Sequence, residues 1–207
     1  MDIYSDTYKT LARPSEVVLY KNSRSKFYGY AFPIKSETEV KPILDDLRKK
    51  HHTANHVCYA WQLGAIDTRY RAYDDGEPHN SAGMAIYGQL QSFEVTDLLV
   101  VVVRIFGGTK LGLAGLTTAY RTTALMTLEM AAIVTRTLQR RFVLSFDYPL
   151  LDVVMRTIKQ HQMEIITQEM AMDCKLVVSV REMDADRIKE EFKAIYGLRI
   201  KKIGDPT

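Results

Sequence analysis

The feature that most constrains the fold is the order of strand and helix patterns in the last 70 or so residues. Alternating apolar residues predict strands over residues 141–146, 164–170, 174–181 and 198–203. Helical spacing predicts one helix beginning near Pro149 and a second that Asp184 caps and that runs to about Tyr196. The resulting order, βαββαβ, is that of a ferredoxin-like domain.

The residues before this unit give a different mixture of patterns. They predict strands over residues 17–20, 26–33, 55–63 and 97–106, and helices over residues 36–50, 81–91 and 116–138. A polar turn joins the first two strands into a hairpin, and a polar loop precedes the second helix. We therefore expect an α+β chain of two domains, residues 1–137 and 138–207, with the boundary near Thr137.

Composition excludes several classes of protein. Lys and Arg number 28 against 25 Asp and Glu, a net charge of +3, which excludes a dedicated polyanion-binding coat but leaves a local basic face open. Two widely separated cysteines do not make a disulfide scaffold, which favours a reducing compartment. The longest apolar run, residues 98–103, is far shorter than the roughly 20 residues that span a bilayer. We expect a soluble cytoplasmic protein with no membrane partner.

A glycine-rich segment lies between a predicted buried strand and a predicted helix. Its candidate ligand-binding residues are Arg104, Gly107, Gly108, Lys110, Gly112 and Gly115. Glycines allow the backbone to approach a ligand, and unpaired N–H groups at a helix start favour an anion such as phosphate. The spacing matches neither of the common nucleotide-binding glycine motifs. Anion binding and a purely structural turn are both open interpretations.

An acidic loop precedes the helix predicted from residue 81. Asp74, Asp75 and Glu77 could bind a hard cation or act as acid and base, or they could accept backbone hydrogen bonds in a turn. Ser81 suits the N-cap of the helix, and it is also a candidate ligand-binding residue together with the three acids. Because further oxygen ligands are not evident, the structural role is preferred and no metal site is predicted.

A third candidate is the strand that contains His56 and Cys58. The two side chains share one strand face with Ala60. Zinc binding would need more ligands, and neighbours on one strand face are poorly placed as a nucleophile and its base. We therefore expect a site-lining or core role for these residues, with His56 as a candidate ligand-binding residue.

The C-terminal unit offers a candidate basic face. If the apolar residues of its strands face the helices, strand alternation places five cations on the open face of the sheet. These residues are Arg141, Lys175, Arg181, Arg199 and Lys201. Such a face could follow a phosphate backbone, although it lacks the aromatic pair of RNA-recognition sheets on its third strand, and the alternative is a solvated surface.

Three ordered motifs together resemble the IMPACT/YigZ family. They lie at residues 56–60, 74–83 and 103–120, and the similarity extends over about residues 15–135. The C-terminal unit is similar to the second domain of the bacterial members. This sequence differs from the family pattern at three positions. The family usually has an aromatic residue in place of Ile105, a glycine in place of Ala114 and often an arginine in place of Thr118.

The resemblance implies a first domain with the α+β fold shared by a ribosomal-protein domain and a translation-factor domain. It also implies a second domain like the last domain of elongation factor G. Eukaryotic relatives regulate translation through an initiation-factor kinase, but they carry an extra N-terminal domain that we do not expect here, so that partner is not carried over.

Three hypotheses follow. The leading one is a non-enzymatic cytoplasmic protein that binds RNA, the ribosome or a protein partner of the translation machinery and needs no cofactor. The alternative is an enzyme acting on a small phosphorylated or acidic substrate, with Asp75 or Glu77 as base and the glycine-rich segment as anion cradle. The third is a protein-interaction module in which the glycines only shape the fold.

Overall fold

The chain folds into two compact units. The computed structural model describes residues 6–204, so the extreme ends of the two predicted domains lie outside it. One unit comprises residues 8–136, and the other comprises residues 137–204 together with Asp6 and Thr7. Within the described residues, no helix is both long and apolar enough to cross a membrane.

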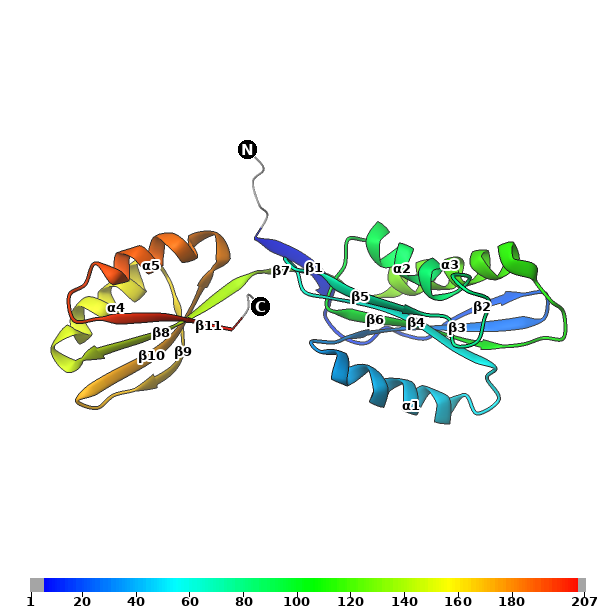
Figure 1. Ribbon diagram of the computed structural model, residues 1–207, viewed down its shortest axis with the longest axis horizontal. Helices are drawn as coiled ribbons and strands as arrows, with labels where there is room; N and C mark the ends of the chain where they lie inside the picture. The colour runs from blue at the N-terminus through cyan, green and yellow to red at the C-terminus, as the bar shows by residue number, and fades with distance from the viewer. Residues whose placement is uncertain (1–5, 205–207) are drawn as a thin grey trace. The chain divides into compact units, whose positions relative to one another are not determined.

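The first unit is built on a five-stranded antiparallel sheet with the order β2-β3-β6-β4-β5. Its strands are β2 (Val18–Asn22), β3 (Ser25–Pro33), β4 (His56–Leu63), β5 (Arg69–Tyr73) and β6 (Leu98–Ile105). Its helices are α1 (Val40–Lys50), α2 (Gly83–Ser92) and α3 (Gly112–Met130), with a 3-10 turn, η1 (Glu37–Glu39), before α1. Helix α1 covers one face of the sheet, and α2 and α3 cover the other (Figure 1).

This layering explains the apolar run of the central strand. Even-numbered residues of β6, such as Val100, pack under α2 and α3, while odd-numbered ones, such as Val101, pack under α1. Both side chains are fully buried because both faces of the sheet are covered. The predicted hairpin is also present, with Ser23 and Arg24 at φ of 46° and 68°, as a two-residue turn between twisted strands requires.

The prediction for the end of the long helix is wrong. Helix α3 ends at Met130, and residues predicted as helix form the strand β7 (Ile133–Thr137), which pairs with β1 (Thr7–Leu11). The β-branched residues of β7 favour a strand, and pairing with β1 outweighs the helical tendency of the alanines before them. Strands β1 and β5 were not predicted from the sequence.

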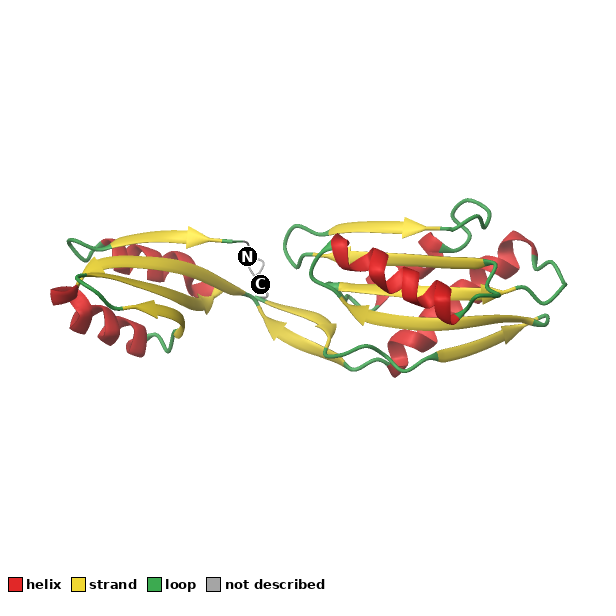
Figure 2. Cartoon of the chain, turned by 90° about the horizontal axis from the view of Figure 1, so that it is seen from below, coloured by secondary structure: helices red, strands yellow, loops and turns green. Residues whose placement is uncertain are grey.

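The second unit has the element order βαββαβ that the sequence predicts. Its strands are β8 (Gln139–Asp147), β9 (Glu164–Glu169), β10 (Asp173–Arg181) and β11 (Arg199–Ile203). Its helices are α4 (Leu151–Gln160) and α5 (Ala185–Lys193), with 3-10 turns η2 (Tyr148–Leu150) and η3 (Glu182–Asp184). The sheet is antiparallel in the order β11-β8-β10-β9, and one of its faces packs against both helices (Figure 2).

Residues from the beginning of the chain complete the second unit. The Asp6 carboxylate accepts two hydrogen bonds from the Arg181 guanidinium, at 2.9 and 3.0 Å. The Leu138 N–H donates to the Asp6 carbonyl at 2.6 Å. Asp6 is only 9% exposed, so it belongs structurally to a unit that otherwise begins 131 positions later, at Thr137.

Candidate functional site

The candidate residues of the first unit gather at one end of its sheet. His56 begins β4 and lies opposite Arg104 near the end of β6, in direct register. Both side chains point to the face covered by α2 and α3, because they continue the rows of Cys58 and Val102 in that core. The sequence correctly predicts that His56 and Cys58 share one strand face.

Glu77 is the centre of a buried polar network. Its Oε1 accepts hydrogen bonds from Arg104 Nη1 at 2.6 Å and from the Tyr120 hydroxyl at 2.8 Å. The Glu77 and Arg104 side chains are only 3% and 6% exposed, so the ion pair is shielded from water. His56 Nε2 lies 3.9 Å from the same carboxylate oxygen. The sequence named Glu77 and Arg104 as candidates but missed Tyr120, which appeared only within a family motif.

His56 is held in one orientation by the acidic loop. Its Nδ1 lies 2.8 Å from the carbonyl oxygen of Asp75, and because a carbonyl only accepts, this contact fixes the proton on Nδ1. The other ring nitrogen, Nε2, then faces the polar network. The loop therefore positions the imidazole.

Beside this network lies a hollow of about 380 Å³, in the size range of small-molecule sites, which is about 300–1,000 Å³. Five of the predicted residues line it: His56, Glu77, Arg104, Lys110 and Gly112. The rest of its wall is formed by Asn55 and by apolar side chains, among them the exposed Phe106 and Leu113. The structure thus brings together residues from β4, the acidic loop, β6 and the start of α3.

Asp74 and Asp75 serve the backbone instead of this hollow. Asp74 accepts hydrogen bonds from the N–H groups of Asn80, Ala82 and Gly83 at 2.8–3.0 Å, and so caps the start of α2. Asp75 accepts from the Val57 N–H at 2.6 Å, and it also pairs with Arg48. The preferred structural interpretation agrees with these contacts.

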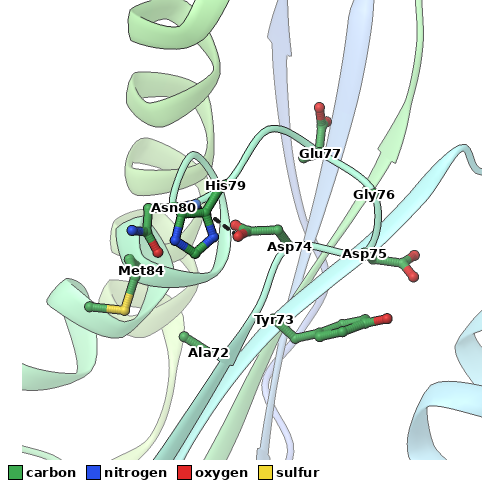
Figure 3. A pocket seen from close by; sticks show the side chains of 9 residues that line it. All are labelled: Ala72, Tyr73, Asp74, Asp75, Gly76, Glu77, His79, Asn80 and Met84. Atoms are coloured by element: carbon green, nitrogen blue, oxygen red, sulfur yellow. Dashed lines mark hydrogen bonds between the residues drawn. The ribbon is translucent and has the colours of Figure 1, made fainter.

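A second hollow, of about 390 Å³, is lined by the acidic loop, the end of β5 and the start of α2. Asp74, Asp75 and Glu77 all line it, but in Figure 3 their carboxylates point in three different directions. Ser81 lies outside both hollows; it is fully buried and donates its hydroxyl proton to the Pro78 carbonyl. The prediction of Ser81 as the N-cap of α2 is wrong, because the helix begins two residues later and its N-cap is Ala82. The three carboxylates therefore do not converge on one point as a cation site requires.

Different structural requirements favour glycine at the four positions of the glycine-rich segment. A Cβ at Gly107 would overlap the backbone of Arg24, so this glycine allows close packing of the β2–β3 turn. Gly108 and Gly112 have φ of 88° and 68°, a left-handed conformation that favours glycine. A Cβ at Gly115 would be tight against Leu111, at 3.1 Å. Of the four, only Gly112 lines the hollow.

Cys58 is unsuited to nucleophilic chemistry. Its side chain is fully buried, and its sulfur lies 3.0 Å from the Asp74 carbonyl and 3.3 Å from the Tyr120 hydroxyl. Burial raises the pKa of the Cys58 thiol far above its ordinary value, so the reactive thiolate is suppressed. Among the residues that the structure describes, no cluster of His, Cys, Asp or Glu could hold a metal ion.

Comparison with known proteins identifies the unit that carries this site. Residues 23–128 match the model of the Impact N-terminal domain, and they include both hollows and the buried network. The chain belongs to the IMPACT family. It is similar to the IMPACT family member YvyE of Bacillus subtilis, with 33% identity over 147 residues that cover 71% of this chain and 66% of that protein.

Other IMPACT-family relatives extend the similarity into the second unit. An IMPACT family member of Haemophilus influenzae is 29% identical over 185 residues, which cover 86% of this chain and 88% of that protein. A crystal structure described as that of a hypothetical protein superposes with a TM-score of 0.69 at 23% identity, covering 96% of this chain and 98% of that one. This last match supports the mixed α+β fold alone.

In this IMPACT-family chain, strand register places all five predicted cations of the C-terminal unit on one sheet face. Lys175 and Arg199 both lie opposite Ser145, Lys201 lies opposite Val143, and Arg141 lies opposite Ser179. All five are exposed. Arg181 differs from the others because its guanidinium pairs with Asp6, so part of its charge is neutralised.

Proposed function

We propose that this IMPACT-family protein is non-enzymatic and binds structured RNA through the open face of the sheet β11-β8-β10-β9, in association with translation. The observation that carries the proposal is the shared face of Arg141, Lys175, Arg199 and Lys201. A phosphate backbone is attracted by clustered cations rather than by net charge, so a chain of net charge +3 can still bind RNA.

The spacing of the cations supports this use. Lys175 and Arg199 flank Ser145 on the neighbouring strands, which separates their backbones by two strand spacings, about 10 Å. Lys201 and Arg141 lie diagonally on adjacent strands, about 7–8 Å apart by ordinary sheet geometry. The four cations therefore form a compact patch on which several phosphates could be contacted together.

The acids on the same face lie at the margins of the patch. Glu169 pairs with Lys175, and Glu164 pairs with Ser179; both belong to the edge strand β9. Asp147 on β8 and Asp173 on β10 lie opposite each other at one end of the sheet, beyond Lys175. We expect RNA to lie along the remainder of β11, β8 and β10, away from the β9 edge and this end, where the carboxylates would repel phosphate.

The association with translation rests on the family resemblance. We propose that the second unit is ferredoxin-like and that the first has the ribosomal-protein and translation-factor fold which the resemblance implies. The antiparallel order β11-β8-β10-β9, with both helices on one face, supports the first part. For the first unit, the support is a five-stranded sheet with helices on both faces.

The non-enzymatic part of the proposal is supported by how the candidate catalytic groups are used. Glu77 is engaged by Arg104 and Tyr120, and Asp75 accepts from backbone and from Arg48. Catalysis by a carboxylate base needs a group free to take a proton from the substrate.

The test is salt-titrated binding of the full chain to a structured RNA. The triple variant Lys175→Ala, Arg199→Ala and Lys201→Ala removes three phosphate contacts. We expect the slope of log affinity against log salt to fall in magnitude by about 2 to 3, with weaker binding at every salt concentration.

A matched control removes the same charge from the helix side of the same unit. It combines Arg156→Ala, Lys159→Ala and Lys193→Ala, all at exposed positions. The control variant should show the same slope of log affinity against log salt concentration as the natural chain. Equal losses in the two triple variants, or unchanged binding in the first, would refute binding by the open face.

A further inference from the structure

The start of α3 is an unsatisfied helix N-terminus beside a hollow. The helix runs for 19 residues, its N-cap is Leu111, and it has neither a side-chain cap nor an acidic residue in its first turn. The first N–H groups of a helix have no partner within the helix, and the helix dipole gives them a partial positive charge. Gly112 and Leu113, at this helix start, line the hollow of about 380 Å³ that also contains His56 and Arg104.

A second and independent feature is an unpartnered donor on Arg104. Its side chain is 6% exposed, and its Nη1 donates to Glu77. Its buried Nε has no hydrogen-bond partner among the described residues. The rings of Phe27 and Phe106 each lie 5.5 Å from its guanidinium carbon, and neither ring can accept a hydrogen bond in the way that an oxygen does. A buried charged donor without an acceptor is costly, which indicates that a ligand supplies one.

The charge balance of the hollow favours an anion with several oxygens. Glu77 is the single carboxylate that lines it, and Arg104 already offsets this charge. Lys110, which is exposed, and the start of α3 then leave a positive excess. A phosphate group can accept hydrogen bonds from helix N–H groups, a lysine and an arginine edge at once.

Apolar side chains line the hollow beside these donors. Phe106 is 41% exposed and Leu113 is 60% exposed, although both are large hydrophobic residues beside a polar site. An aromatic ring with one free face can stack on a planar base, which contributes about 1–3 kcal/mol per base in single-stranded nucleic acids. We propose that this hollow binds the phosphate monoester of a nucleotide, with the phosphate at the start of α3 and the base against Phe106.

This site is independent of the proposed RNA-binding face, because every residue in it belongs to the other unit. The phosphate monoester could come from a free nucleotide or from the 5′ end of an RNA strand. Both sources present the same chemistry to the hollow, and separate ligands in the experiment distinguish them.

The experiment measures binding to the full chain by calorimetry with five ligands. These are inorganic phosphate, adenosine, adenosine 5′-monophosphate, and one short RNA with either a 5′-phosphate or a 5′-hydroxyl. We expect the monophosphate to bind at least about tenfold more tightly than adenosine or inorganic phosphate, because it uses both the donors and the apolar wall. If the ligand is a free nucleotide, the RNA with a 5′-phosphate should bind no more tightly than the RNA with a 5′-hydroxyl. If the ligand is an RNA end, the 5′-phosphate should clearly increase the affinity.

Surface variants test the site without disturbing the buried network. Leu113→Glu places a carboxylate at the first turn of α3, where it suits the helix dipole but repels phosphate, and we expect at least about tenfold weaker binding with no loss of thermal stability. Lys110→Ala should weaken binding by about threefold to tenfold. The control for position is Lys41→Ala, on α1 across the sheet, which should bind as the natural chain does. The control for charge is Leu113→Gln, which removes the apolar contact without adding a carboxylate and should weaken binding less than Leu113→Glu.

Two results would overturn the proposal. One is the absence of any preference for adenosine 5′-monophosphate over adenosine. The other is unchanged monophosphate binding in both Leu113→Glu and Lys110→Ala. The triple variant of Lys175, Arg199 and Lys201 should bind the monophosphate normally, so failure of the RNA-binding proposal is distinguishable from failure of this one.

Discussion

Replacing Glu77 with glutamine removes a buried negative charge and almost preserves the shape of the side chain. In the folded first unit, this carboxylate is paired with Arg104 at 2.6 Å, and the Arg104 side chain is only 6% exposed. The variant leaves the guanidinium charge in the same shielded place with a neutral amide beside it. The Tyr120 hydroxyl can still donate to the amide oxygen, so the change isolates the charge.

Breaking a buried ion pair by removal of one partner costs about 3–5 kcal/mol, because the remaining charge is left uncompensated. The glutamine oxygen still accepts hydrogen bonds, so we expect the lower end, about 3 kcal/mol. Domains of ordinary size have unfolding free energies of about 5–15 kcal/mol, so the variant should fold but have much less stability in reserve. At a typical urea m-value of about 2 kcal/mol per molar, the unfolding midpoint should fall by about 1.5 M.

The assay uses Trp61, the chain's single tryptophan, which is 5% exposed in the core under α1. Its fluorescence reports unfolding of the first unit alone. Glu37→Gln is the matched control: Glu37 pairs with Arg71 at 57% exposure, and such surface pairs contribute about 0–1 kcal/mol. A midpoint shift for Glu77→Gln no larger than that of Glu37→Gln would refute the view that Glu77 holds the buried guanidinium.

Three further predictions concern the same unit. Gly29→Ala drives a methyl group into Thr127 of α3 and should cost about 1–3 kcal/mol in urea unfolding, most of which Thr127→Ala in the same chain should recover. Asp74→Ala removes the acceptor of three N–H groups at the start of α2 and should cost about 1–2 kcal/mol, whereas Asp74→Asn should cost less. Burial raises the pKa of the Cys58 thiol, so the thiol stays protonated in the folded protein at a pH where it ionises in the unfolded chain. The unfolding free energy should therefore fall as pH rises above about 8.5, the ordinary pKa of a cysteine thiol. Cys58→Ser should flatten this pH dependence.

The parts of the fold that were predicted from the sequence are those in which one strand or helix face is buried. These patterns are visible in the sequence itself: buried and exposed residues alternate along β8 and β10, and β6 is a continuous apolar run. Strands β5 and β7 are short, and their residues are exposed or half-buried throughout. Their pairing partners hold them in place, and backbone pairing alone leaves no hydrophobic periodicity along the chain.

The candidate site divides in a similar way. Residue types that suit a polar site were recognised, but the roles of Asp74 and Glu77 differ although only two positions separate them. Asp75 and Gly76 both have positive φ, at 45° and 85°, and this bend turns the two carboxylates in different directions. Tyr120 lies 43 positions from the carboxylate to which it donates. Contacts of this kind depend on the assembled fold, which local spacing does not encode.

The ion pair between Asp6 and Arg181 has a consequence for biosynthesis. The two residues are 175 positions apart in the chain and are bonded within one unit. At ribosomal rates of about 5–20 residues per second, Asp6 emerges some 9–35 seconds before its partner exists. The first unit can fold during that interval, while the second must wait for the last part of the chain and then recapture a segment made at the outset.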